Sequence, residues 1–301
     1  MRQKRVIVLM ICVIFISLGL VWGKADNGQA KSSNVTVLSE SDIKEDIESD
    51  DATMDWEMKK AMMKKMSVAL SNRNTIDYNS NTEVNVPVLM YHSINYEKDN
   101  ELRVPKEVFR EHMKYLHDKG FSTLTMEEYY NAINSGKKVP KKPVLVTFDD
   151  GYKDNYTNGF PILKEYNIKG TIFVITSTID NSSSYLSSSE LKELQQNNID
   201  IESHTVNHRE LSGLSYEEQL QELKDSKELI DRLLNKNTIA ICFPVGKFND
   251  DTINACKKAG YKLGFTTKPG FSNFDQGVYK LKRVRVNSST TVDQLDSILG
   301  Q

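Results

Sequence analysis

Apolar runs and amphipathic stretches alternate along the chain from about residue 84 to its end. Short runs rich in β-branched residues predict buried strands, and longer stretches with apolar residues three and four positions apart predict helices. The predicted strands cover residues 86–91, 144–146, 171–175, 199–202, 239–243, 262–266 and 278–286. The predicted helices cover residues 105–119, 126–134, 154–166, 189–197, 216–234, 252–259 and the chain from 292. This alternation predicts an α/β fold with a parallel sheet, and about seven strand-helix units fit an irregular (β/α) barrel better than an open sheet.

The chain begins with a different pattern. Three basic residues, Arg2, Lys4 and Arg5, precede a run from Val6 to Trp22 without any charge, which is typical of a signal peptide or a membrane anchor. The run is longer than a usual signal-peptide core, yet it is at the short end for a helix that spans a bilayer. Both interpretations therefore stay open, and small residues that a signal peptidase could recognise follow from Gly23 to Ala25.

The sequence predicts three parts. Residues 1–25 are the signal peptide or membrane anchor, and residues 84–301 are the folded domain. Between them, residues 26–83 are rich in Ser, Asn, Asp, Glu and Lys, which predicts a largely disordered polar linker with a candidate helix over 55–70. We therefore expect an extracellular protein that is either tethered to the membrane by its N-terminal segment or secreted after cleavage.

Composition narrows the range of partners. The 301 residues are 39% hydrophobic, which is sufficient for one sizeable core. The formal net charge is -2, so a polyanionic partner such as nucleic acid is not expected. The expected oligomeric state is a monomer. Cys242 and Cys256 fall in a predicted strand and helix, where small buried side chains are expected, and their spacing does not require a disulfide.

Polar groups at the ends of predicted strands are the candidates for chemistry. His92 ends the first strand, Asp149 and Asp150 follow the apolar run 144–146, and His204 and His208 follow the strand 199–202. The working residues of a βα barrel gather at the carboxyl ends of its strands. Two adjacent carboxylates there raise each other's pKa, and desolvation raises both, so we expect a cation nearby.

The two histidines suggest what that cation is. His204 and His208 are four positions apart, and with one carboxylate they would form a three-ligand site open to water, as catalytic zinc requires. Taken alone, such a histidine pair is more often a surface or capping pair, and an Asp-Asp-Gly turn is more often a cap. Their joint occurrence at strand ends favours a metal site.

These motifs carry a resemblance to a known family. The segment Thr147-Phe-Asp-Asp-Gly151, followed about fifty residues later by Ser203-His-Thr-Val-Asn-His208, resembles the first two motifs of the polysaccharide deacetylase family, also called the NodB-homology domain or carbohydrate esterase family four. The resemblance runs from about Val84 to the end of the chain. The first strand, Val88 to Ser93, is similar to that of the subgroup acting on poly-N-acetylglucosamine.

The resemblance implies roles for individual residues. Asp150, His204 and His208 match the family's metal ligands, usually for Zn²⁺ although another divalent transition metal is an alternative. Asp149 matches the general base. The segment Phe243-Pro-Val-Gly246 resembles the third motif, in which the main-chain N–H of Val245 would bind the oxyanion.

The chain also departs from the family pattern. The family commonly has an aromatic residue where Val245 stands and an arginine shortly before Phe243, which orients the base. Arg283 and Arg285 are candidates to pair with Asp149 instead, and we expect only one of them to point inward. An exposed cationic strand edge is the alternative for either arginine.

The general acid is the second departure. Many members have a late histidine that protonates the leaving amine, but this chain has no histidine after His208. Either His92 replaces it or Asp149 acts first as base and then as acid, and a structural, hydrogen-bonded role for His92 is equally open. The expected substrate contacts are Tyr152, Phe243 and Pro244.

We therefore expect an exported, metal-dependent hydrolase that removes N-acetyl groups from an N-acetylglucosamine-containing glycan of the cell envelope or the extracellular space. One alternative is an O-acetyl polysaccharide esterase, because an alkoxide leaves more easily than an amine anion. A second alternative is a glycan-binding module without catalysis, suggested by the missing late histidine and by Val245. The complete set of base and metal residues argues against that second alternative.

Overall fold

A computed structural model describes residues 85–135 and 139–300 of the chain. The predicted signal peptide or anchor and the predicted linker, with its candidate helix, lie outside these residues. Among the helices that the structure does describe, none has the length and apolar character needed to cross a membrane.

The observed strands and helices agree with those predicted to within a few residues, except that the helix predicted over 154–166 is split into a π-helical turn (Asn155–Gly159) and α6. The strands are β1 (Val88–Tyr91), β2 (Ser122–Thr123), β3 (Pro143–Phe148), β4 (Gly170–Val174), β5 (Ile199–Ser203), β6 (Ala240–Cys242), β7 (Leu263–Pro269) and β8 (Leu281–Arg285). The helices are α4 (Lys106–Asp118), α5 (Met126–Ser135), α6 (Phe160–Glu165), α7 (Ser188–Gln196), α8 (Tyr216–Leu234), α9 (Asp250–Ala259) and α10 (Val292–Leu299). Only β2 was not predicted, because two residues are too short for a periodic pattern to show.

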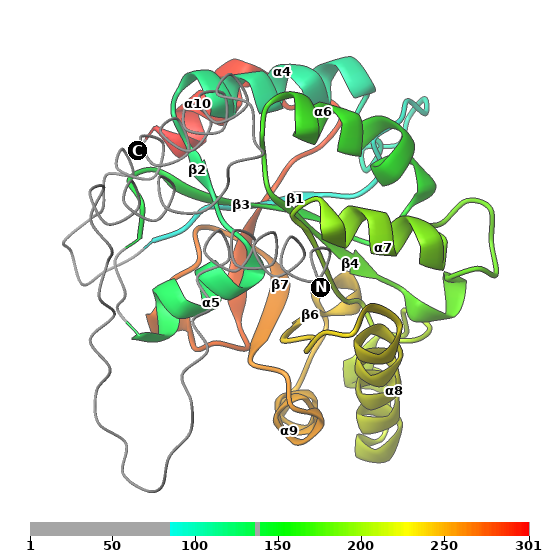
Figure 1. Ribbon diagram of the computed structural model, residues 1–301. Helices are drawn as coiled ribbons and strands as arrows, with labels where there is room; N and C mark the ends of the chain where they lie inside the picture. The colour runs from blue at the N-terminus through cyan, green and yellow to red at the C-terminus, as the bar shows by residue number, and fades with distance from the viewer. Residues whose placement is uncertain (1–84, 136–138, 301) are drawn as a thin grey trace, which may run out of the picture. The chain divides into compact units, whose positions relative to one another are not determined.

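Seven parallel strands close into a barrel. Their order around the ring is β1, β8, β7, β6, β5, β4 and β3, and a pairing of β1 with β3 closes it. Strand β2 lies outside the ring and pairs with the first two residues of β3. Figure 1 shows the strands at the centre with the helices around them. The predicted irregular (β/α) barrel is therefore confirmed.

The barrel is irregular between β5 and β6, which share a single register pair, Ser203 with Ile241. Where the ladder between β5 and β6 is interrupted, the side chain of Glu202 accepts main-chain hydrogen bonds instead. Its Oε2 accepts the main-chain N–H groups of Ile239 and Ala240 at 2.9 and 2.7 Å, and its Oε1 accepts from Lys236 Nζ at 2.7 Å. Burial raises the pKa of Glu202, and the attraction of Lys236 opposes that rise. The carboxylate satisfies main-chain donors that would otherwise be buried without partners.

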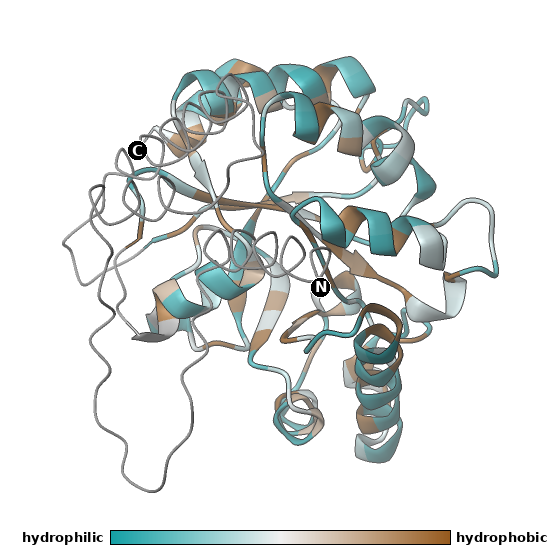
Figure 2. Cartoon of the chain, viewed as in Figure 1, coloured by the Kyte–Doolittle hydropathy of each residue, from teal (hydrophilic) through white to brown (hydrophobic). Residues whose placement is uncertain are grey.

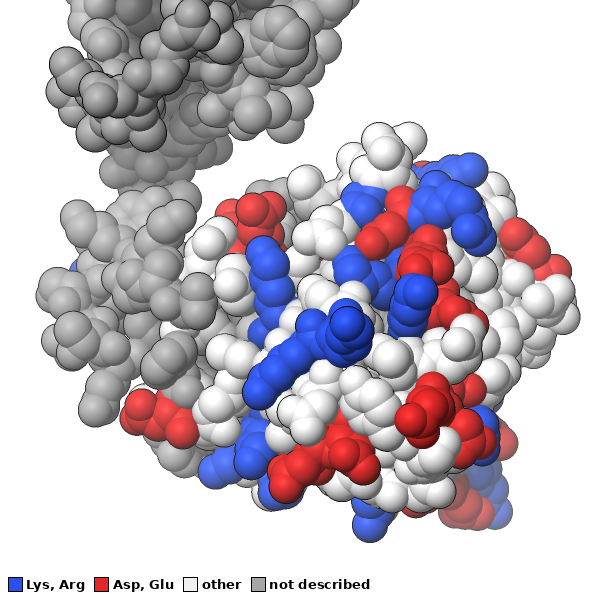
Figure 3. Space-filling view, turned by 90° about the horizontal axis from the view of Figure 1, so that it is seen from below, with Lys and Arg blue, Asp and Glu red and all other residues white. Residues whose placement is uncertain are grey.

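Strand burial explains the near-continuous apolar runs in the sequence. Every residue of β1, β3 and β4 is buried, as expected for parallel strands covered on both faces. In Figure 2 the strands are mostly hydrophobic, whereas the helices show hydrophilic outer sides. Acidic and basic side chains are interspersed on the face shown in Figure 3.

Side-chain caps fix where several helices begin, directly after the loops at the barrel mouth. Helices α7, α8, α9 and α10 each start with a capping box, at Ser187, Ser215, Asn249 and Thr291. In each box the cap side chain accepts from the third helical N–H while that residue's side chain bonds back. These caps limit the freedom of the loops that carry the candidate site.

Candidate active site

Five strands of the ring deliver polar groups to the carboxyl end of the barrel. Strands β1, β3, β5, β6 and β8 carry or precede His92, Asp149, Asp150, His204, His208, Cys242, Val245 and Arg283. Of these residues, only Cys242 was not among the predicted site residues.

A sharp turn separates the two carboxylates that follow β3. Asp150 and Gly151 both have left-handed main-chain conformations, with φ of 73° and 77°. A Cβ at Gly151 would lie 3.0 Å from Val174 Cγ1, so glycine is needed there both for its conformation and for the close approach. The turn directs Asp149 and Asp150 toward different partners, and both remain buried, with 2% and 8% of their surface exposed.

Asp149 forms a buried ion pair with Arg283. Two guanidinium nitrogens donate to the two carboxylate oxygens, Nη1 to Oδ1 at 2.8 Å and Nη2 to Oδ2 at 2.7 Å, and Nε donates to the carbonyl of Thr266 at 2.9 Å. Burial alone would raise the pKa of Asp149, but the charge and hydrogen bonds of Arg283 outweigh burial and lower it well below its usual range. Arg285 is exposed, so Arg283 is the inward-facing member of the two candidates. The cation expected beside the paired carboxylates is, for Asp149, an arginine of the chain itself.

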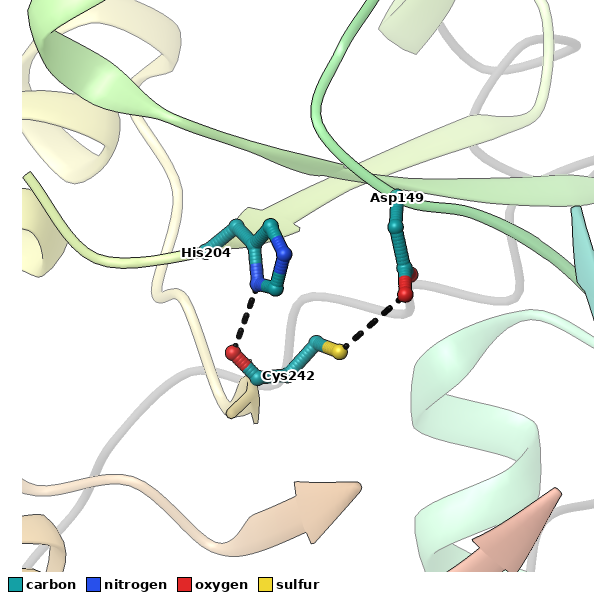
Figure 4. Close-up of side chains that lie close together, drawn as sticks. All are labelled: Asp149, His204 and Cys242. Atoms are coloured by element: carbon teal, nitrogen blue, oxygen red, sulfur yellow. Dashed lines mark hydrogen bonds between the residues drawn. The ribbon is translucent and has the colours of Figure 1, made fainter. Parts of the chain in front are cut away.

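Asp150 faces the two histidines. Its Oδ1 lies 3.3 Å from His204 Nε2 and 3.5 Å from His208 Nε2. His204 Nδ1 lies 2.7 Å from the carbonyl oxygen of Cys242, which can only accept, so Nδ1 carries a proton (Figure 4). Burial opposes a charge on His204, but its interactions with Cys242 and Asp150 outweigh burial and raise its pKa. A metal bound at Nε2 would therefore displace a proton from that nitrogen. Burial, followed by the charge of His204, lowers the pKa of His208, which favours the neutral imidazole that binds metals.

The donor set Asp150, His204 and His208 fits a divalent metal. Its three ligand atoms lie within 4.8 Å of one another. Asp150 Oδ1 is buried and has no hydrogen-bond partner among the described residues, which is a costly arrangement unless a cation completes it. A hydrogen bond from the far side of the imidazole ring, such as the one that His204 makes, is the usual support for a metal-binding histidine.

A second group, Asp149, His204 and Cys242, lies equally close together but does not fit a metal. Arg283 already binds both oxygens of Asp149, and its Nη2 lies 2.9 Å from Cys242 Sγ. The Cys242 thiol in turn lies 3.4 Å from Asp149 Oδ2, and His204 Nδ1 is engaged by the Cys242 carbonyl (Figure 4). The polar atoms of this group are satisfied by the protein.

His92 lies beside the base. Its Nε2 is 3.9 Å from Asp149 Oδ2, and its Nδ1 is buried without a hydrogen-bond partner among the described residues. Burial lowers the pKa of His92, although the charges of Asp149 and Asp150 oppose the shift. The main-chain carbonyl of His92 accepts from Asn155 Nδ2 at 2.7 Å, which holds the end of β1 against the turn after β3.

Val245 occupies a strained position at the end of β6. Its φ is 48° and its ψ is 15°, a conformation that β-branched residues rarely adopt. None of the hydrogen bonds formed within the described residues uses its main-chain N–H. Its side chain is half exposed. Strain of this kind, held by the surrounding structure, is common at functional sites.

Comparison with known proteins identifies the family. The sequence profile described as polysaccharide deacetylase matches residues 136–264. The Bacillus subtilis (strain 168) protein named "Putative polysaccharide deacetylase YxkH" is 48% identical over 202 residues, which cover 67% of this chain and 71% of that relative. The chain belongs to the polysaccharide deacetylase family. The predicted family and the predicted class of enzyme, a hydrolase, are thus confirmed.

Two further relatives of this deacetylase agree. A poly-β-1,6-N-acetyl-D-glucosamine N-deacetylase of Staphylococcus epidermidis is 32% identical over 200 residues, covering 62% of this chain and 68% of its own. The solved structure of the Streptococcus pyogenes deacetylase PplD in complex with acetate matches with a TM-score of 0.70 and 36% identity, over 72% of this chain and 99% of that one. The similarity therefore covers the barrel and not only its motifs.

Two of the predicted substrate contacts of the deacetylase lie below its surface. The side chains of Phe243 and Pro244 are buried in this structure. The ring of Phe243 stacks on Phe248 with centroids 5.1 Å apart, and a Cβ at Gly264 would lie only 2.7 Å from Phe243 Cζ. The phenylalanine at the end of β6 is thus a packing residue, and Val245 is the side chain that this turn exposes.

Tyr152 lies at the mouth of the deacetylase barrel, within a small stack that the sequence did not reveal. Its ring stacks on Tyr185 with centroids 5.2 Å apart, and the guanidinium of Arg103 lies 5.4 Å from its ring centre. Tyr185 is an aromatic residue within a serine-rich loop, a signal that could have marked it. Arg103 had no local signal, because it comes from the loop after β1.

Proposed function

We propose that this deacetylase removes N-acetyl groups from an N-acetylglucosamine-containing glycan of the cell envelope or the extracellular space, in a metal-dependent hydrolysis. The observation that carries the proposal is the unpartnered, buried oxygen of Asp150 facing His204 and His208, beside a carboxylate that Arg283 keeps ionised. The name of the Staphylococcus epidermidis relative supports a poly-N-acetylglucosamine substrate.

Asp150, His204 and His208 would hold the metal, Zn²⁺ or another divalent transition metal. When bound, such an ion supplies a Lewis acid that activates water and polarises the acetyl carbonyl. The chain prepares the site by fixing the tautomer of His204 through Cys242. It also leaves Oδ1 of Asp150 without a hydrogen-bond partner among the described residues.

The remaining residues of the site transfer protons or stabilise charge during the reaction. Asp149 accepts a proton from the attacking water, and Arg283 holds its carboxylate ionised and correctly oriented, although the low pKa also makes it a weaker base. The main-chain N–H of Val245 donates to the oxyanion that forms as water adds to the acetyl carbon. The C–N bond then breaks, and the amine nitrogen receives a proton either from His92 or back from Asp149, which lie 3.9 Å apart.

We further propose that the barrel works outside the cell as a monomer. The charge-free run from Val6 to Trp22 behind three basic residues supports export, either as a tethered or as a secreted protein. The barrel carries all the proposed catalytic groups on one chain.

The test is acetate release from N-acetylglucosamine oligomers by purified protein. We expect activity that a chelator abolishes and added zinc restores, and a loss of about 100-fold or more in kcat for Asp149→Asn, because general-base catalysis contributes on this scale. Asp275→Asn, which changes an acidic residue outside the site, serves as the control. Full activity in Asp149→Asn would refute the assigned base, and activity that resists chelation would refute the metal requirement.

An O-acetyl esterase is the second candidate. It is favoured by one observation, the lack of a histidine after His208, since an alkoxide leaving group needs less protonation than an amine. Comparing acetate release from matched ester and amide glycans distinguishes the two activities. A preference for esters of more than about tenfold in kcat/KM would favour the esterase.

A further inference from the structure

The two candidate histidine ligands are held in different ways. The ring of His204 is 2% exposed and is fixed through Nδ1 by the Cys242 carbonyl. The ring of His208 is 34% exposed and packs edge-on against the ring of His204, with centroids 4.7 Å apart. Its main-chain N–H donates to Thr205 Oγ1 at 3.0 Å. Apart from the ring contact, the position of the His208 ring is set by the main chain of the loop that carries it.

That loop has an unfavourable main-chain conformation. Thr205 and His208 both lie in the left-handed region, with φ of 68° and 56°, and Thr205 is β-branched. Such conformations persist where the surrounding structure determines them. On one side of the loop, the N–H groups of Thr176 and Ser177 donate to the carbonyls of Thr205 and Val206 at 3.1 and 3.0 Å.

On the other side, one carboxylate holds the centre of the loop. Glu222 of α8 is 6% exposed, and its Oε2 accepts the consecutive main-chain N–H groups of Val206 and Asn207 at 3.0 and 2.9 Å. Its Oε1 accepts from Asn207 Nδ2 at 2.8 Å. Hydrogen bonds to an ionised acceptor are the stronger kind, and they fix both the position and the rotation of two successive peptide groups.

We propose that Glu222 is a positioning residue for the metal site. It holds the main chain at residues 206 and 207 so that the ring of His208 faces Asp150. It touches neither the metal position nor the substrate, and it acts through the loop alone. The inference rests on the proposed metal-dependent function, because its effect is exerted on a metal ligand.

The affinity for zinc, measured on metal-stripped protein against a competing chelator, tests the role. We expect Glu222→Ala to raise the Kd for zinc by about 10- to 100-fold, the range typical of outer-sphere partners of metal ligands. Asp225→Ala is the matched control, since Asp225 is an exposed acidic residue on the same helix and lines the same hollow as Glu222. The control should bind zinc within about twofold of wild type, because it contacts no part of the loop main chain.

The outcomes separate the two proposals. Zinc binding by wild type with an unchanged Kd in Glu222→Ala would overturn the role of Glu222 and leave the proposed function intact. A wild-type protein that binds no zinc would overturn both.

A conservative substitution distinguishes positioning from mere packing. In Glu222→Gln the side-chain carbonyl still accepts both main-chain N–H groups, and the new amide can donate to Asn207 Oδ1 once the Asn207 amide turns over. Glu222→Met fills a similar volume but offers neither N–H group an acceptor. We expect Glu222→Gln to bind zinc within about threefold of wild type and Glu222→Met to bind as weakly as Glu222→Ala. Zinc affinity in Glu222→Gln no better than in Glu222→Met would overturn the proposal, and the Tm of each metal-free variant shows that folding does not explain the difference.

Discussion

Asp149 and Asp150 are adjacent in the chain, yet their carboxylates differ in their hydrogen-bond partners. The left-handed conformations of Asp150 and Gly151 turn the main chain sharply after Asp149. Arg283 directs its five N–H donors to both oxygens of Asp149 and to Thr147, Thr266 and Cys242, so none is left for the neighbouring carboxylate. Asp150 is thereby kept as an acceptor without a protein donor at Oδ1, which is the property a metal ligand needs.

The ion pair of Asp149 with Arg283 gives the first prediction at this scale. Arg283→Met leaves Asp149 buried without its partner, and we expect the free energy of unfolding to fall by about 3–5 kcal/mol. Adding Asp149→Asn should recover part of that loss, since no uncompensated charge remains, but it should not restore acetate release. Chemical denaturation measures both changes.

The control for this prediction is Arg285→Met, which alters an exposed arginine on the same strand and should change stability by about 0.5 kcal/mol or less. An Arg283→Met protein as stable as wild type would show that the buried pair is not a structural requirement.

At the scale of elements, β5 and β6 share fewer register pairs than any other neighbouring strands of the ring, and a proposed metal ligand follows β5. Strands β5 and β6 share one register pair, and Glu202 supplies the acceptors that a full ladder would have provided. His204 follows β5 directly, and its Nδ1 donates to the last residue of β6. The separation of β5 and β6 therefore sets the orientation of the His204 ring.

Substitutions of Glu202 test whether its side chain bridges β5 and β6. In Glu202→Leu the N–H groups of Ile239 and Ala240 remain buried without acceptors, so we expect a loss of about 2–4 kcal/mol in the free energy of unfolding. Glu202→Gln keeps an acceptor for both N–H groups and should cost about 1 kcal/mol, chiefly through the lost charge opposite Lys236. Thermal and chemical unfolding measure these differences, and equal stability of the two variants would contradict the bridging role.

At the scale of the whole molecule, the ring of seven strands closes within residues 85–300 through the pairing of β1 with β3 and β8. The described residues, 85–135 and 139–300, all belong to one compact unit, whose bounds are Ala69–Gln301. The proposed catalytic groups all lie in that unit. A closed barrel with its own core is expected to fold without further chain.

Truncation tests that independence. A protein that starts at Ala69 should fold cooperatively, with a Tm within about 4 °C of the full chain, and should release acetate at the same kcat. Calorimetry and the acetate assay on both proteins provide the measurement. A truncated protein that fails to fold would mean that the chain before Ala69 contributes to barrel stability.

The sequence by itself determined the features that depend on local order. Apolar runs and helical spacing predicted the alternation of strands and helices, and hence the barrel. Because parallel strands present their carboxyl ends on one side, the same pattern placed Asp149, Asp150, His204 and His208 together. The two motifs pointed to the family for the same reason, since each is a short segment of contiguous residues.

Only the tertiary structure decided the contacts between distant residues. Arg283 and Arg285 are two positions apart on β8, so what distinguishes them is their place along the strand: Arg283 is enclosed by the ring, whereas Arg285 ends the strand and is exposed. The packing of Phe243 depends on the close approach of Gly264 from the next strand. Glu222 gave no local signal, because its partners lie 15 and 16 residues earlier in the chain. The physical reason is common to all of them: closing the ring brings side chains together across long stretches of sequence, and no local pattern encodes which of them will meet.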